Sequence, residues 1–239
     1  MSNELLHRAV AAHGGLERFN QFKTVSAHLV TGGGLQSLKG QAGVLSTDVT
    51  VELHQQHASF APFKLPNQRA VFTPERVSIE TNEGAVVAER ANPRAAFAGH
   101  VRETLWDDLH LMYFAGYAMW TYLTVPFSLT WPGFEAREIE PWQEQGQTWR
   151  RLEVTFPPSI ASHSSEQTLY IGDDGLLRRH DYVDKIAGNF PVAHYVSAYQ
   201  DVSGLLIPTK RRAFARQPDN TPVLDVLTVS IDLSDIRCA

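Results

Sequence analysis

The densest group of chemically active side chains is the stretch RRHDYVD, residues 178–184. In an extended strand alternate side chains point to opposite faces, so His180 and Tyr182 share one face while Arg179 and Asp181 share the other. We expect the first pair to point inward and to offer polar groups to a bound molecule. We expect Arg179 and Asp181 to form an ionic outer face of the strand, with ion pairs that add little stability.

Histidines in this half of the chain could carry acid–base chemistry. If Asp173–Asp174 forms a two-residue turn, His180 lies opposite Gln167 and His163 lies near Asp184. A His–Asp pair can orient an imidazole as a general base. Because a register shift of one residue would undo such pairs, polar contacts on a solvated face stay open as the alternative. The candidate imidazoles for a catalytic site are His163, His180 and His194.

No motif of a known catalytic, nucleotide-binding or metal-binding class is present. There is no G-x-S-x-G nucleophile elbow and no P-loop, and the glycines at 32–34 precede a strand-like segment instead of a helix. None of the ten histidines has the spacing of a metal-binding motif, and Cys238 is the only cysteine. We therefore expect no metal and no cofactor, and the sequence names no catalytic residue.

An uncharged, aromatic-rich segment must help to position these side chains. It reads WDDLHLMYFAGYAMWTYLTVPF, residues 106–127, and no Asp, Glu, Lys or Arg occurs between Asp108 and Glu135. Glycine, threonine and tyrosine interruptions, the helix breaker Pro126 and the absence of flanking basic clusters argue against a transmembrane segment. Apolar residues at three- and four-residue spacing predict a helix that runs into the interior. The β-branched and aromatic stretch 121–130 predicts a strand after it.

Period-two patterns and turn signals dominate the remainder of the chain. A short helix is predicted over Asn3 to Ala12. Strands before the aromatic segment are predicted around Val25–Leu29, Val49–Leu53, Val77–Ile79 and Val86–Val87. Seven more are predicted after it: Phe134–Trp142, Thr148–Phe156, Ser164–Ile171, Leu176–Asp184, Val192–Asp201, Leu205–Arg216 and Val223–Leu233. The fold class is therefore mainly β (α+β), a single strongly curved antiparallel sheet or half-barrel with helices plugging its concave face. No shift in composition divides the chain, so we expect one domain, residues 1–239.

Composition indicates a globular protein without a nucleic-acid partner. The chain has 239 residues, of which 43% are hydrophobic and 20% charged, and its formal net charge is −5. This balance gives no basic surface for nucleic acid. The first residues are charged from Glu4 onward and contain no apolar signal region, so we expect a cytoplasmic location.

Two stretches resemble a known family. LYIGDDGLLRRHDYVD, followed by AHYVSAYQDVSGLLIPTKRRAF, is similar to the C-terminal hairpins of bacterial lipoprotein carriers of the Lol type (LolA/LolB-like). The N-terminal HGGLERFNQFKTVSAHLV looks like the helix, Gly–Gly stop and first strand of such chains. The resemblance implies an incomplete antiparallel barrel whose concave face is plugged by helices over an apolar cavity for acyl chains. Uncharacterised cytoplasmic relatives are the nearer comparison.

Two functions follow. In the first, the protein binds or carries a hydrophobic, lipid-like small molecule in a cavity between the curved sheet and the plug helix. In the second, it is an enzyme that acts on an apolar small molecule with a His/Asp/Tyr site in the same cavity. Packing alone could also explain the aromatic residues. The expected ligand-binding residues are Trp106, His110, Met112, Phe114, Tyr117, Trp120, His180, Tyr182 and Tyr195.

Overall fold

The computed structural model describes residues 4–41 and 45–239, and within these ranges thirteen strands form one antiparallel sheet. The helices are α1 (Glu4–Ala12), α2 (Leu16–Phe19), α3 (Gly34–Leu38) and α4 (Asp108–Thr124), with 3-10 helices η1 (Pro93–Phe97) and η2 (Phe127–Thr130). The strands are β1 (Thr24–Gly32), β2 (Leu45–Glu52), β3 (Ala58–Ala61), β4 (Gln68–Phe72), β5 (Arg76–Thr81), β6 (Val86–Ala91), β7 (Glu135–Glu144), β8 (Gln147–Thr155), β9 (Glu166–Ile171), β10 (Leu177–Asp184), β11 (Phe190–Val202), β12 (Leu205–Arg216) and β13 (Pro222–Cys238).

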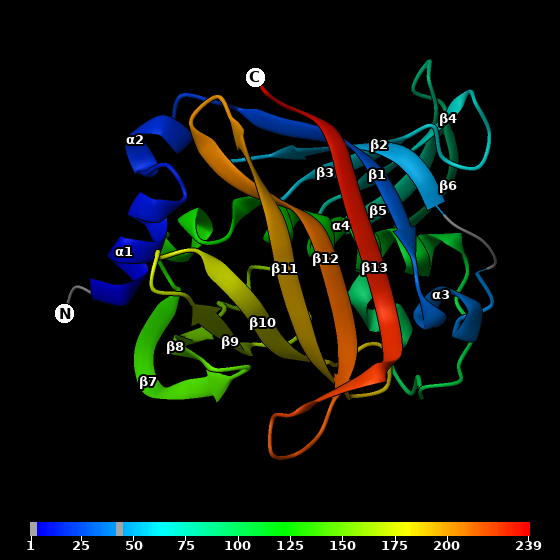
Figure 1. Ribbon diagram of the computed structural model, residues 1–239. Helices are drawn as coiled ribbons and strands as arrows, with labels where there is room; N and C mark the ends of the chain where they lie inside the picture. Colours follow the sequence, from blue (N-terminus) through cyan, green and yellow to red (C-terminus); the bar gives the residue numbers. More distant parts are fainter. Residues whose placement is uncertain (1–3, 42–44) are drawn as a thin grey trace.

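The order of the strands makes the sheet a meander that is joined in its middle by the two ends of the chain. It runs β6-β5-β4-β3-β2-β1-β13-β12-β11-β10-β9-β8-β7, and every neighbouring pair is antiparallel. The sheet curves strongly but does not close, because β6 and β7 remain as edges (Figure 1). The predicted fold class, a curved antiparallel sheet with a helical plug, is confirmed.

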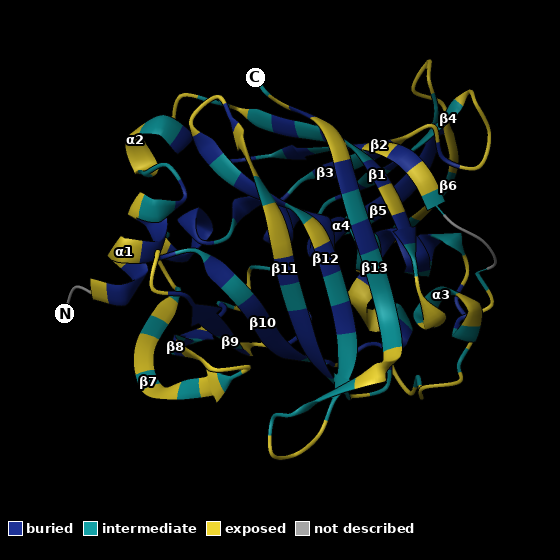
Figure 2. Cartoon of the chain, in the orientation of Figure 1, coloured by how far each residue is buried: buried dark blue, intermediate teal, exposed yellow. Residues whose placement is uncertain are grey.

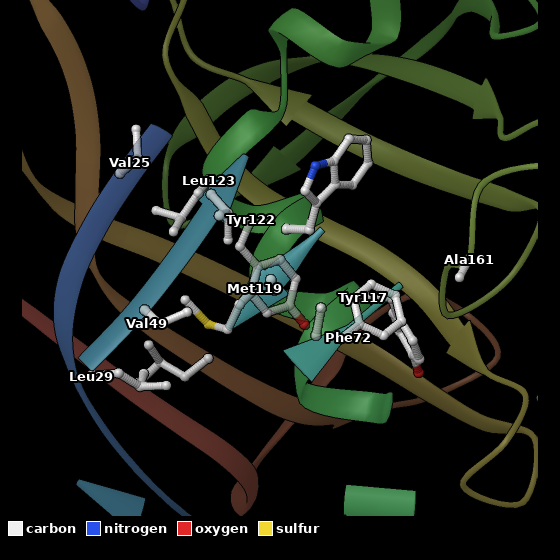
Figure 3. Packing of buried hydrophobic residues seen from close by; sticks show 14 of the residues in the cluster. Val25, Leu29, Val49, Phe72, Tyr117, Met119, Tyr122, Leu123 and Ala161 are labelled. Carbon is white, nitrogen blue, oxygen red and sulfur yellow. The ribbon is translucent and has the colours of Figure 1, made fainter. Parts of the chain in front are cut away.

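Helix α4 occupies the hollow of the sheet. It packs against β2, β3, β4, β5 and β6, and nearly all of its residues are buried (Figure 2). Met119 extends from α4 toward Leu29 of β1 and Val49 of β2 (Figure 3). The helix starts at a capping box in which Asp107 accepts a hydrogen bond from the His110 backbone N–H at 2.9 Å. Since a helix that is apolar on all sides must be surrounded by protein, the prediction that it runs into the interior is confirmed.

The predicted strand over residues 121–130 is wrong. Helix α4 continues to Thr124, and residues 127–130 form the 3-10 helix η2. Burial explains the difference. These side chains are enclosed on all sides, and the packing that they gain in the helix outweighs the preference of threonine and tyrosine for strands. The Thr124 hydroxyl also donates to Trp120 O at 2.9 Å, so it is satisfied within the helix. The helix ends at Thr124, just before Pro126, and not near Trp120 as predicted.

The other predicted elements are found with shifted ends. Helix α1 lies where a helix was predicted, although Asn3 is outside the described residues. All eleven predicted strands overlap observed strands, whereas β3 and β4 were not assigned to residues in advance. Helices α1 and α2 lie at one end of the sheet, where Phe19 stacks on Phe127 of η2 with ring centroids 4.3 Å apart (Figure 1). In the described part of the chain, no helix combines the length and the apolar character needed to cross a membrane.

Candidate functional site

An apolar hollow, called the first hollow here, lies between α4, α3 and the inner face of β1 and β13. Its volume is about 50 Å³. Its walls include Leu111, Ala115, Ala118, Met119 and Tyr122 of α4, Leu35 of α3, and Leu29 and Ile231 of the sheet. Almost all of this lining is hydrocarbon, as expected for a site that takes an apolar group.

A second hollow adjoins the first and has polar groups at one end. Its volume is about 170 Å³, and it shares Leu35, Phe114 and Val229 with the first hollow. Tyr182 and Asp184 of β10 contribute the polar groups of its inner wall. Together the two hollows form what we call the groove, apolar at one end and polar at the other.

Three of the nine predicted ligand-binding residues line the groove. Trp106 and Phe114 line the first hollow, and Phe114 and Tyr182 line the second. Trp106 is buried, and its Nε1 has no hydrogen-bond partner among the described residues. Their role in binding stays a prediction.

Four predicted residues lie away from the groove and have structural contacts. Met112 and Trp120 are fully buried, and Trp120 Nε1 donates to Glu52 O at 2.9 Å and to Gln55 O at 2.8 Å. His110 caps α4 and packs on Phe97, with ring centroids 4.7 Å apart. The fourth is Tyr117, which contacts a histidine of the polar cluster described below.

Tyr195, which was expected to bind the ligand, does not face the inside of the sheet. Tyr195 pairs with Arg179 across β10 and β11, so it lies on the face opposite to His180 and Tyr182. Its hydroxyl donates to Glu144 Oε1 at 2.6 Å.

The expectation of a solvent-facing ion pair at Arg179 and Asp181 is also wrong. Arg179 Nε and Nη2 donate to the two carboxylate oxygens of Asp181 at 2.6 and 2.7 Å, and both residues are buried. Arg179 also donates to Glu144 at the end of β7 and to Asn220 O in the β12–β13 turn. These two segments cover the outer face of β10. The alternation of residues along one strand does not indicate that distant segments of the chain will cover it.

A buried polar cluster stands behind the inner wall of the groove. Tyr122 Oη lies 2.9 Å from His163 Nε2 and 2.9 Å from Tyr182 Oη. Tyr182 Oη lies 3.3 Å from His194 Nδ1, and Tyr117 Oη lies 3.3 Å from His163 Nδ1. The tyrosines of α4 therefore belong to the same hydrogen-bond network as Tyr182 of β10 and His194 of β11. We use the name polar cluster for six residues: Tyr117, Tyr122, His163, Tyr182, His194 and a third histidine, His180.

The predicted pairs around the β9–β10 turn are found, but not in the predicted register. His180 Nε2 lies 2.6 Å from Gln167 Oε1, although His180 pairs directly with Leu169. Leu177 pairs with Ile171, one residue out of the predicted register, and the irregularity between Leu177 and Arg179 adds a second residue to the shift. His163 Nδ1 lies 3.8 Å from Asp184 Oδ2, which confirms that these two residues are close.

Burial keeps four members of the polar cluster uncharged, namely His180, His194, Tyr122 and Tyr182. It lowers the pKa of His180 and of His194 well below the ordinary value, and the Arg211 charge acts in the same direction on both. It also raises the pKa of Tyr122 and Tyr182. At neutral pH these imidazoles and phenols are neutral donors and acceptors.

Several residues of the site were not found from the sequence. Tyr122 is the centre of the polar cluster, and Arg211 is buried beside it with Nη2 donating to Tyr122 O at 2.5 Å. The signal for the groove was present: Leu111, Ala115, Ala118 and Tyr122 recur at spacings of four, three and four. This is one face of a helix. Only Tyr122 lies beyond the predicted end of the helix near Trp120, and the other three were inside the predicted helix but were not assigned to a binding face.

Metal binding has no candidate in the described ranges 4–41 and 45–239, where no three His, Cys, Asp or Glu side chains are grouped to hold an ion. The polar cluster can instead orient or hydrogen-bond a neutral group that enters the groove.

Solved structures share this fold over nearly the whole chain, whereas no protein-family model and no curated protein matches the sequence. A DUF1329 family protein from Desulfovibrio piger has a TM-score of 0.57 at 14% identity, over 98% of this chain and 91% of that chain. A LolA superfamily protein from Nitrosomonas europaea has a TM-score of 0.55 at 7% identity, over 100% and 94%. A Vibrio parahaemolyticus domain named for outer membrane lipoprotein sorting has a TM-score of 0.56 at 8% identity, over 98% and 91%. Identities this low bear on the fold alone: the chain shares the fold of these three proteins, one of which is a LolA superfamily protein, as the sequence resemblance predicted.

Proposed function

We propose that the protein binds a hydrophobic, acyl-chain-like small molecule in the groove between α4 and the inner face of the sheet. The observation that carries this proposal is the apolar lining of the first hollow, to which α4, α3, β1 and β13 all contribute. The shared fold supports it, because one of the similar domains is named for lipoprotein sorting. Carriage of that molecule between sites is the wider form of the same proposal.

The size of the groove limits what enters it without rearrangement. The hollows measure about 50 and 170 Å³, and a cavity of about 150 Å³ accommodates benzene, whereas drug-sized ligands occupy about 300 Å³ or more. A longer chain therefore requires one wall to move. Helix α3 is the wall that moves most cheaply, because it has five residues and none of them is buried.

The test fills the groove and measures binding. Ala115 is half-buried on the groove side of α4, so Ala115→Phe places a ring in the first hollow. Ala11→Phe makes the same change on the exposed side of α1 and is the matched control. We expect native mass spectrometry to detect a complex of the wild type with dodecanol or another twelve-carbon amphiphile. Ala115→Phe should weaken it by about tenfold or more, and Ala11→Phe should leave it unchanged.

Two results would refute the proposal. One is a wild type that shows no complex and no thermal shift with any amphiphile of a panel that varies in chain length and head group. The other is an Ala115→Phe variant that is folded and binds as the wild type does.

An enzyme that acts on such a molecule is the second candidate, and the polar cluster is the observation that favours it. His163 and His194 are each within hydrogen-bond distance of a tyrosine, an arrangement that can orient an imidazole. Both histidines are only 1% exposed, so a substrate would have to reach them past Tyr182. Incubation with a bound amphiphile, followed by mass spectrometry, tests this candidate, and unchanged ligand after prolonged incubation would remove it.

The cytoplasmic location expected from the sequence stays a prediction. Fractionation of the native host with immunodetection of the protein tests it.

A further inference from the structure

Asp184 is a buried carboxylate at the polar end of the groove. It is the last residue of β10, is 4% exposed and lines the second hollow. Its Oδ1 has no hydrogen-bond partner among the described residues. Its Oδ2 lies 3.8 Å from His163 Nδ1, which is beyond hydrogen-bond distance.

Two cations near the second hollow, Lys39 and Arg102, form no ion pair with Asp184. Lys39 is buried, and its Nζ donates to Val101 O at 3.2 Å and to Arg102 O at 2.7 Å. The Arg102 guanidinium, which belongs to a residue of the hollow's wall, lies over the ring of Phe190 at 5.0 Å. In the described part of the chain, no lysine or arginine lies within ion-pair distance of Asp184, although the charge of Lys39 is near enough to interact with it. The described residues thus supply no hydrogen-bond donor to Oδ1 of Asp184.

A buried acceptor without a donor costs about 1–3 kcal/mol, and more when it is charged. An ionised carboxylate accepts hydrogen bonds and cannot donate them. A hydroxyl or amine that enters the second hollow would satisfy Oδ1, whereas a carboxylate would place a second negative charge beside it.

We propose that Asp184 accepts a hydrogen bond from the head group of the bound molecule, which is an apolar chain that ends in a hydroxyl or amine and not in a carboxylate. This inference rests on the proposed function, because it assigns the polar end of the same groove. The chain lies in the first hollow and the head group reaches Asp184 through the second.

The experiment compares three probes of equal chain length: dodecanol, dodecylamine and dodecanoate. Dissociation constants are measured at neutral pH, below the micelle concentration, for the wild type, Asp184→Asn and Asp173→Asn. Asp173 is exposed in the β9–β10 turn, so its change removes one negative charge away from the groove and is the matched control. Circular dichroism and thermal melts establish that each variant is folded.

The wild type should bind dodecanol and dodecylamine at least about tenfold more tightly than dodecanoate. Asp184→Asn should weaken dodecylamine and strengthen dodecanoate, since the amide carries no charge and can donate. Asp173→Asn should keep the order of the wild type. A preference for dodecylamine over dodecanol would assign the head group as a cation, and the reverse would assign it as a neutral hydroxyl.

The outcomes separate this inference from the proposed function. If no probe binds the wild type, the proposed function fails. If all three bind the wild type equally, or if folded Asp184→Asn keeps the order of the wild type, the groove remains and the role of Asp184 is refuted. The order of the three probes on the wild type decides the matter even if Asp184→Asn does not fold.

Discussion

Tyr122 joins two parts of the chain that are 60 residues apart, through its hydrogen bond to Tyr182. A buried hydrogen bond adds only about 1 kcal/mol to stability, but an unsatisfied partner costs about 1–3 kcal/mol. The polar cluster therefore destabilises any docking of α4 in which its tyrosines do not reach His163 and Tyr182. In this way a network of modest net strength fixes the position of the helix, and thereby the shape of the groove.

His13 should make the protein sensitive to acid. Burial lowers the pKa of His13 from 6.5 to about 4, although its hydrogen bond to Ala9 O opposes the shift. Between these pH values the unfolded chain binds a proton that the folded chain does not. The stability from His13 is therefore fully present above pH 6.5 and is lost as the pH falls toward 4, by about 3 kcal/mol at most.

Urea unfolding at two pH values measures this loss. Between about pH 7 and about pH 4.5, His13→Gln should lose about 2.5 kcal/mol less than the wild type. His7→Gln, a change at an exposed position of the same helix, is the control and should lose as much as the wild type. Equal losses for the wild type and His13→Gln would contradict the prediction. The lowered pKa of His180 and His194 acts in the same direction, so a residual loss is expected in every variant.

At the scale of elements, the approach of α4 to β4 depends on one glycine. A Cβ at Gly116 would lie 2.2 Å from Phe72 Cγ and 2.4 Å from Phe72 Cβ, and Phe72 is fully buried. Gly116→Ala must therefore push the helix away from the strand. We expect a loss of about 1–3 kcal/mol in the free energy of unfolding, as for other overpacked cores, even though alanine favours a helix.

A second glycine-to-alanine change separates the clash from helix propensity. Gly34, in α3, has an ordinary helical backbone, and a Cβ there would meet nothing closer than Leu227 O at 3.5 Å. Chemical denaturation should show Gly34→Ala at wild-type stability or above it. If Gly116→Ala matched that result, the contact between α4 and β4 would be looser than the structure describes.

Helix α4 also shows how far a pattern of residues predicts an element. Its start was predictable, because Asp107 and the first apolar residues form a common helix signal. Its end was not, since Thr121 to Thr124 have strand propensity and only burial on every side keeps them helical. The apolar wall of the groove crosses that end, so an error of four residues hid the face of α4 that carries Tyr122.

At the scale of the molecule, the sequence predicted the sheet but not the segments that cover its outer face. Alternation and turn residues were sufficient to predict a curved antiparallel meander, because they are local signals. The burial of Arg179 and Asp181 depends on Glu144 and Asn220, which lie 35 and 41 residues from Arg179 in the chain. Contacts of that range leave no local pattern, so the outer face of β10 was predicted as exposed and Tyr195 as a ligand-binding residue.

The continuity of the sheet leads to a prediction about unfolding, and to our proposal that residues 1–239 form one domain. Strand β13 pairs with β1 on one side and with β12 on the other, so the last strand of the chain joins its two halves. Helix α4 packs on β2 to β6, and its tyrosines bond to histidines in the other half. Neither half can lose its structure without exposing the core of the other. Scanning calorimetry should therefore show one transition, with calorimetric and van't Hoff enthalpies in a ratio of about one. Two resolved transitions, or intrinsic fluorescence that changes before circular dichroism, would show that the halves unfold separately and that β13 is a link between two domains.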